Sequence, residues 1–76
     1  MSVKIYSTPS CVYCNMAKDY FRKNQINFTD YNVANDIAKA EEMTRKSGQM
    51  GVPVIDINGQ IIVGFNRDAV DKALHR

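Results

Sequence analysis

Two cysteines separated by two residues are the groups in this sequence best suited to chemistry. Cys11 and Cys14 lie in the stretch TPSCVYCNMAK, residues 8–18, and they are the only cysteines among the 76 residues. A pair with this spacing can ligate a metal, form a stabilising disulfide, or alternate between dithiol and disulfide. The surrounding ligands and secondary structure decide between these kinds of site.

A metal site and a stabilising disulfide are both poorly supported. Structural zinc needs four ligands, whereas here one C-x-x-C pair is accompanied by a single histidine, His75. The N-terminal MSVKIYS lacks the layout of a signal peptide, which indicates a cytoplasmic protein whose thiols are kept reduced. We therefore expect no bound metal and no permanent disulfide. Two unreactive buried thiols are a further alternative, because free cysteine packs as a small hydrophobic residue.

Composition indicates one small globular domain spanning residues 1–76. Hydrophobic residues make up 45% and charged residues 24% of the chain, and the formal net charge is only +2. The basic residues are scattered among acidic ones, so nucleic acid is not an expected partner. No apolar stretch approaches the roughly 18 residues of a membrane span. We expect a monomer that binds neither nucleic acid nor membrane.

The first half of the chain has the pattern of a β-α-β unit. Alternating and β-branched residues predict strands at residues 3–7 and 26–33, with a helix from residue 12 to about residue 24 between them. The helix prediction rests on an apolar face formed by Val12, Met16, Ala17, Tyr20 and Phe21. A second, weakly amphipathic helix is expected to be capped by Asn35 or Asp36 and to end near Ser47, before Gly48.

The second half is expected to add a hairpin and a last helix. Apolar runs in residues 52–64 flank Asn58-Gly59, the preferred pair for a type I′ turn. Asn66 is positioned to cap the last helix. The order strand, helix, strand, helix, hairpin, helix predicts an α/β fold with a four-stranded mixed sheet and three helices that cover both faces. The first two strands should be parallel, with a right-handed crossover.

Within this arrangement the cysteines lie at the turn between a strand and a helix. A C-x-x-C pair beside a β-α-β pattern in a cytosolic protein is typical of a redox dithiol. The free N–H groups and the positive end of the helix dipole favour a thiolate at Cys11. Cys14 lies one turn further on, within reach of a disulfide with Cys11. Cys11 is thus predicted to be the nucleophile and Cys14 the resolving thiol.

Three segments resemble the glutaredoxin family of the thioredoxin superfamily, and the resemblance covers essentially the whole chain. CVYCNMAK is similar to the family's C-P-Y-C-x-x-A-K segment, with Val12 in place of proline. GVP at residues 51–53 takes the place of T-V-P, and GFNRD at 64–68 takes that of a G-G-x-D-D-like segment. The resemblance implies a thioredoxin-like fold. Because the W-C-G-P-C of thioredoxin is missing, thioredoxin itself is not indicated.

The resemblance also implies an activity and a binding site. It implies a glutathione-dependent thiol–disulfide oxidoreductase with no permanently bound cofactor, whose partners are glutathione as co-substrate and disulfide-containing proteins. Pro53 would be a cis-proline that leaves the backbone of Val52 free for a thiol-containing peptide, and Tyr13 would flank that peptide. A glutathione carboxylate would bind where the last helix begins. The implied contacts are Thr8, Tyr13, Gly51, Val52, Pro53, Gly64, Asn66 and Arg67.

Departures from the family pattern keep other functions open. Thr8 replaces a common lysine, Val63 replaces the first glycine of the Gly-Gly pair, and Arg67 replaces an acidic residue. GF followed by a basic residue and Asp also resembles short redoxins that donate electrons to ribonucleotide reductase and are reduced by thioredoxin reductase. Another alternative is an iron–sulfur carrier, a glutathione-bridged dimer; a non-catalytic interaction domain is the last. Lys18 either supports the thiolate or is a solvated charge.

Overall fold

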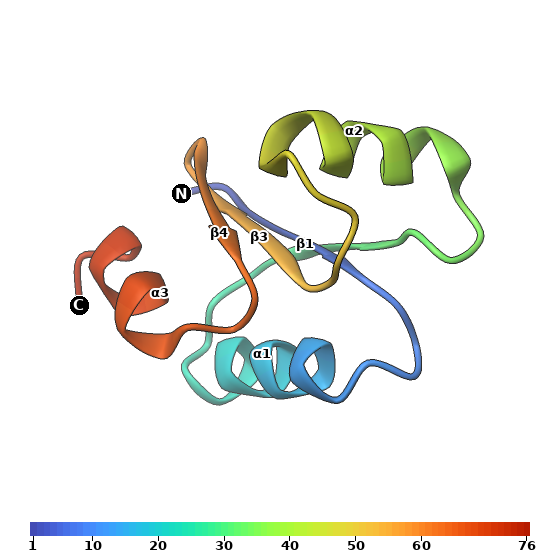
Figure 1. The fold of residues 1–76 in the computed structure, drawn as a ribbon. Helices are drawn as coiled ribbons and strands as arrows, with labels where there is room; N and C mark the ends of the chain where they lie inside the picture. The colour runs from blue at the N-terminus through green and yellow to red at the C-terminus, as the bar shows by residue number, and fades with distance from the viewer.

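The computed structural model describes all residues, Met1 to Arg76 (Figure 1). The chain forms the predicted succession of elements: β1 (Val3–Ser7), α1 (Val12–Lys23), β2 (Thr29–Asn32), α2 (Ile37–Ser47), β3 (Val54–Ile57), β4 (Gln60–Val63) and α3 (Arg67–Ala73). None of the three helices has the length and apolar character needed to cross a bilayer.

The four strands form one mixed sheet in the order β2-β1-β3-β4. β1 is parallel to β2 and antiparallel to β3, and β3 is antiparallel to β4. Figure 1 shows α1 and α3 on one face of the sheet and α2 on the other. The predicted mixed sheet with helices on both faces is therefore confirmed.

The main hydrophobic core lies between the sheet and the α1–α3 layer. Alternate residues of β3 supply Ile55 and Ile57 to this face, whereas Val54 and Asp56 face α2, as the two-residue period of a strand requires. Eleven buried residues form this core: Val3, Ile5, Ala17, Phe21, Ile26, Ile55, Ile57, Ile62, Val70, Ala73 and Leu74.

The buried face of α1 differs from the predicted one. Its fully buried residues are Cys14, Ala17 and Phe21, spaced three and four residues apart as one helical stripe requires. Val12 and Met16, which the apolar pattern placed on the inner face, are 68% and 47% exposed. The buried stripe begins at Cys14 and runs through Ala17 to Phe21, and Val12 and Met16 lie off this stripe on the surface.

β2 is shorter than the expected 26–33 and covers only four residues. Gln25 has a left-handed backbone (φ 56°), and the N–H of Ile26 bonds to the carbonyl of Phe21 at 2.8 Å, which closes the end of α1. Ile26 and Phe28 pack on the core as part of this connection. Their apolar character reflects burial of a loop and not strand pairing.

The predicted helix and turn boundaries are confirmed. Asp36 caps α2 by accepting a hydrogen bond from the N–H of Lys39 at 3.1 Å, and Gly48 ends that helix in the left-handed conformation. Asn58 and Gly59 both have positive φ, 52° and 90°, as a type I′ turn requires. Capping side chains and glycines with positive φ at these positions therefore set where each element starts and stops.

A polar network fixes α2 on its face of the sheet. The buried Tyr6 hydroxyl donates a hydrogen bond to the Glu42 carboxylate and accepts one from the Lys46 ammonium at 2.8 Å. Lys46 also bonds to the largely buried Asp56 of β3 at 2.9 Å. Hydrogen bonds from Tyr6 and then from Lys39 lower the pKa of Glu42 to about 2.

Glu42→Gln should lower the stability of the fold at neutral pH and have little effect in strong acid. A carboxylate with a lowered pKa stabilises the fold above its ordinary pKa of 4.5, and this contribution is lost as the pH falls towards 2. Chemical unfolding at pH 7 should show a loss of about 1 kcal/mol, because the pairs are partly solvated. Glu41→Gln, an exposed neighbour without an ion pair, is the matched control. A loss that is equal at pH 7 and pH 2.5 would contradict this role.

Candidate active site

Cys11 is the N-cap of α1, directly after the loop that follows β1. Its sulfur accepts a hydrogen bond from the N–H of Cys14 at 3.1 Å, and its own N–H bonds to the carbonyl of Thr8 at 3.3 Å. The side chain is partly exposed. The cap position directs the first N–H groups of the helix towards this sulfur, and such groups stabilise negative charge. The predicted placement of Cys11 at the helix start is therefore confirmed.

Cys14 lies in the opposite environment. Its side chain is fully buried on the inner face of α1. Burial, followed by the hydrogen bond with Cys11, raises the pKa of the Cys14 thiol from 9.0 to about 12. In the reduced protein this group is a neutral thiol screened from solvent, so an external disulfide meets Cys11 first.

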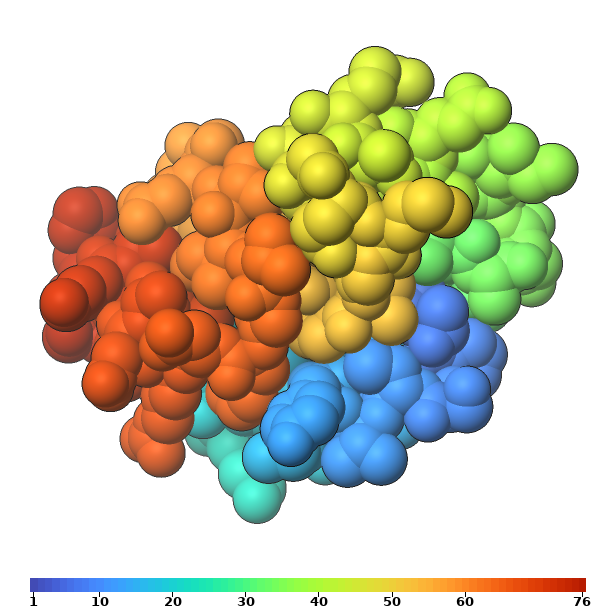
Figure 2. All heavy atoms as spheres, in the orientation of Figure 1, coloured from blue at the N-terminus to red at the C-terminus, as the bar shows by residue number.

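The loop before β3 brings Val52 against the reactive sulfur. The Val52–Pro53 bond is cis, as predicted. The Cys11 thiol lies 3.9 Å from the carbonyl oxygen of Val52, and neither the N–H nor the carbonyl of Val52 bonds to another backbone group. In Figure 2 this yellow-gold loop meets the blue start of α1 on the surface. A backbone donor without a backbone partner, and an acceptor that faces only the Cys11 thiol, therefore lie beside Cys11.

Gly64 joins the end of β4 to the same loop. Its N–H bonds to the carbonyl of Pro53 at 2.8 Å, and its φ of 80° lies in the left-handed region that favours glycine. This bond continues the β3–β4 pairing beyond the register of Val54 with Val63. Gly64 thus supports the loop that carries Val52 and Pro53.

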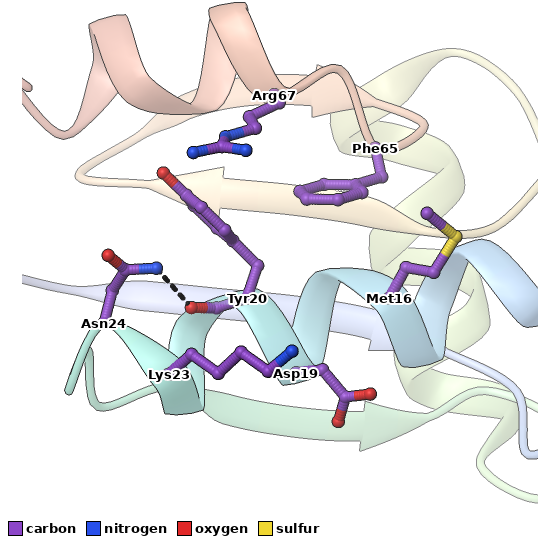
Figure 3. Close-up of a pocket in the computed structure, with 7 residues that line it drawn as sticks. All are labelled: Met16, Asp19, Tyr20, Lys23, Asn24, Phe65 and Arg67. Atoms are coloured by element: carbon purple, nitrogen blue, oxygen red, sulfur yellow. Dashed lines mark hydrogen bonds between the residues drawn. The ribbon is translucent and has the colours of Figure 1, made fainter.

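Asn66 and Arg67 are placed differently from that group. The Asn66 side chain caps α3 by accepting a hydrogen bond from the N–H of Ala69 at 3.2 Å. The Arg67 guanidinium lies 4.8 Å above the ring of Tyr20, and its Nε lies 3.8 Å from Asp71. Figure 3 shows Arg67 and Phe65 over α1, in a groove lined by Met16 and Tyr20. Arg67 thus contacts Tyr20 of α1 and Asp71 of its own helix, and neither contact is with the cysteines.

Lys18 is an ion-pair partner on the inner side of α1 and not the solvated charge that the sequence left open. Its ammonium lies 2.7 Å from the Asp30 carboxylate, and its side chain is only 11% exposed. Asp30 also accepts a hydrogen bond from the buried Ser7 hydroxyl at 2.6 Å. The positive charge of Lys18 opposes the rise in the pKa of Cys14, but burial outweighs it.

Two exposed apolar residues, Val12 and Tyr13, directly follow Cys11 in α1. Tyr13 is 63% exposed and lies next to the exposed Val12, so the residue predicted to flank a bound peptide is accessible. Thr8 contacts the dithiol only through its backbone, because its side chain makes no hydrogen bond. Tyr13 is therefore accessible next to Cys11, whereas the carbonyl of Thr8 is used by the N–H of Cys11.

Comparison with known proteins identifies the class. The glutaredoxin family model matches residues 3–62. A glutaredoxin-like 8.6 kDa protein of uncharacterised function from the rubredoxin operon of Clostridium pasteurianum is 50% identical over 97% of this chain and 99% of its own length. Glutaredoxin 3 of Escherichia coli K12 is 36% identical over 83% of this chain and 76% of its own. The chain therefore belongs to the glutaredoxin family.

Solved structures share the fold of this chain. A glutaredoxin from Archaeoglobus fulgidus superposes with a TM-score of 0.90, covering 99% of this chain and 87% of that one, at 16% identity. The glutaredoxin-like NrdH-redoxin from Escherichia coli superposes with a TM-score of 0.80 over 95% and 93%, at 26% identity. The architecture is the thioredoxin-like fold that the resemblance implied.

Residue-type patterns did not single out Gln49, which makes several contacts in the loop before Val52. Its side-chain amide bonds to both the N–H and the carbonyl of Gly51. The only sequence signal is a glutamine two residues before a glycine, which is too common to be interpreted alone. The contact became apparent only in the folded loop.

Alkylation should distinguish the two thiols. In the native reduced protein, iodoacetamide at pH 8 should modify Cys11 alone, because Cys14 is buried and its pKa is about 12. In denaturant both thiols should react, and mass spectrometry counts the adducts. Cys11→Ser is the matched control and should take up no label until it is unfolded. Rapid double labelling of the native protein would contradict the buried, neutral state of Cys14.

Proposed function

We propose that this glutaredoxin-family protein is a glutathione-dependent thiol–disulfide oxidoreductase that works through the Cys11–Cys14 dithiol. One observation carries the proposal: a partly exposed cysteine at a helix N-terminus lies 3.9 Å from Val52, whose backbone N–H and carbonyl have no backbone partner. The sulfur that would attack a disulfide and the backbone groups that would bind a peptide thus lie next to each other. The chemistry needs a reducing compartment, and we place the protein in the cytoplasm.

The reaction exchanges one disulfide for another. The Cys11 thiolate attacks a sulfur of the substrate disulfide, forming a mixed disulfide while the other substrate sulfur leaves as a thiolate and takes up a proton. Cys14 then loses its proton and attacks Cys11, which releases the second substrate thiol and forms the Cys11–Cys14 disulfide. Two electrons pass from protein to substrate. Two glutathione molecules restore the dithiol and become glutathione disulfide.

The backbone of Val52 is the proposed docking point for the cysteinyl part of glutathione. An extended peptide can pair with a free N–H and carbonyl as an added strand does. Gly51 and Pro53 hold this residue from either side, Gly64 supports Pro53 from β4, and Tyr13 flanks the guest. A shared strand-like contact explains how peptides of different sequence can present their sulfur to Cys11.

The remaining contacts concern the thiolate and the glutathione carboxylates. The carbonyl of Thr8 accepts a hydrogen bond from the N–H of Cys11, and the lysine that the resemblance expects at position 8 is replaced by threonine. We assign one carboxylate to the N–H groups that follow Asn66. Arg67 supplies positive charge to that segment, although its guanidinium also contacts Tyr20 and Asp71.

A second candidate is a redoxin that donates electrons to ribonucleotide reductase and is reduced by thioredoxin reductase. The structural likeness to NrdH-redoxin favours it, since that glutaredoxin-like protein is described as having a thioredoxin-like activity profile. Arg67 and Thr8 also depart from the usual glutathione site. Against it, Glutaredoxin 3 is the more similar of these two named relatives, at 36% identity.

Electron-donor specificity tests the two candidates. Reduction of a glutathione–peptide mixed disulfide should proceed with NADPH, glutathione reductase and glutathione, and much less with NADPH and thioredoxin reductase. Cys14→Ser should keep measurable glutathione-dependent turnover, because a mixed disulfide on Cys11 can be resolved by free glutathione. The same variant should lose reduction of protein disulfides, which needs the second thiol.

Cys11→Ser is the control and should reduce both activities to background, since no nucleophile remains. The loss of NADPH absorbance in the coupled assay provides the readout. Turnover with thioredoxin reductase alone would overturn the glutathione proposal in favour of the redoxin. Background rates with both donors in the wild type would overturn both.

A further inference from the structure

The loop between α2 and β3 contains a side chain that holds the backbone of its neighbour. The Gln49 Oε1 accepts a hydrogen bond from the N–H of Gly51 at 2.6 Å, and its Nε2 donates one to the carbonyl of Gly51 at 3.1 Å. One amide group therefore satisfies both polar backbone groups of the residue that precedes Val52. We call these two residues the Gln49–Gly51 pair.

The pair is itself attached to the end of α2. The second N–H of Gln49 Nε2 donates to the Ser47 hydroxyl at 3.1 Å. That hydroxyl lies 3.0 Å from the carbonyl of Gln49 and 2.7 Å from the carbonyl of Met43 inside the helix. The Gln49 amide thus uses both N–H groups and its oxygen, and its position is fixed relative to α2.

A side chain at position 51 would compete with the Gln49 amide for the same space, and the backbone angle of Gly51 is not in the left-handed region. A Cβ atom on Gly51 would lie 2.8 Å from the Oε1 of Gln49, closer than real Cβ contacts allow, so any side chain there would displace the amide. The resemblance places threonine at this position of the T-V-P segment. The departure from that pattern is therefore matched by a glutamine that needs the space.

Holding the Gly51 carbonyl also orients Val52. The Gly51 carbonyl and the Val52 N–H belong to the same peptide group, which is planar, so in the trans form they point in opposite directions. The bond from Nε2 to the Gly51 carbonyl thereby fixes the direction of the Val52 N–H. This N–H has no backbone partner and lies on the residue that contacts Cys11.

We propose that Gln49 is a positioning residue that pre-orients the Val52 backbone for peptide substrates, with Gly51 as the residue that makes room for it. The inference rests on the proposed role of Val52. Groups held in the binding geometry before the substrate arrives avoid the entropy loss of ordering them upon binding. The pair should therefore act on substrates with a peptide backbone and leave the reactivity of Cys11 itself unchanged.

Two small disulfides separate these effects. Reduced protein is mixed with glutathione disulfide, which carries peptide groups, or with bis(2-hydroxyethyl) disulfide, which has none. The second-order rate constant of protein oxidation is measured for each by acid quench and mass spectrometry. Gln49→Ala should lower the ratio of the two constants about tenfold, the size expected when one residue's backbone must be ordered on binding. The rate with bis(2-hydroxyethyl) disulfide should stay the same.

A double-mutant comparison tests the pairing. Gly51→Ala should lower the ratio as Gln49→Ala does, because the new methyl group displaces the amide. The double variant should be no worse than either single one, as expected of residues that act through one contact. Gln60→Ala, at an exposed glutamine without a side-chain hydrogen bond, is the matched control and should leave the ratio unchanged. If Gln49→Ala does not fold, the ratio for Gly51→Ala decides.

The outcomes separate this inference from the proposed function. A wild-type protein with no preference for glutathione disulfide would overturn the role of Val52 and the inference with it. A wild-type preference that persists in Gln49→Ala or in Gly51→Ala would overturn the inference alone. A fall in both rate constants together would show a general effect on Cys11 and would also overturn it.

Discussion

The site depends on the unequal burial of two cysteines one helical turn apart. Cys14 belongs to the inner stripe of α1 with Ala17 and Phe21, so packing of the core removes it from solvent. Cys11, three residues earlier, caps the helix and stays partly exposed. The way α1 packs on the sheet therefore leaves the Cys11 thiol partly exposed to solvent and keeps the Cys14 thiol buried and protonated. The order of attack in the proposed reaction follows from that asymmetry.

Strand order explains why residues 41 positions apart in sequence meet at the site. β1 and β3 are antiparallel neighbours, with Tyr6 opposite Val54. The C-terminal end of β1 and the N-terminal end of β3 therefore lie at the same end of the sheet. The loop that follows β1 meets the loop that precedes β3. Cys11 and Val52 each lie in one of these loops, which gives the contact of 3.9 Å.

The features that could be predicted from the sequence are those that depend on residues close together in the chain. Caps and turns such as Asp36 and Asn58-Gly59 signal boundaries because their side chains or backbone angles act within a few residues. The inner face of α1 was mispredicted because exposed Met16 next to a site has the same hydrophobicity as a core residue. The contact of Gln49 with Gly51 has no period at all, since a polar side chain in a loop binds whichever backbone group folding brings near it.

The polar network on the α2 face of the sheet fixes the loop that leads to Val52. Lys46, in the last turn of α2, bonds to Asp56 of β3, so the helix end and the strand are joined directly. The connection from Gly48 to Pro53 thus spans two fixed points, and its interior is held by Gln49. A short loop fixed at both ends and in its middle has few conformations to lose on binding. The network on the α2 face thus fixes both ends of the loop that carries Val52, although none of its side chains hydrogen-bonds to the cysteines.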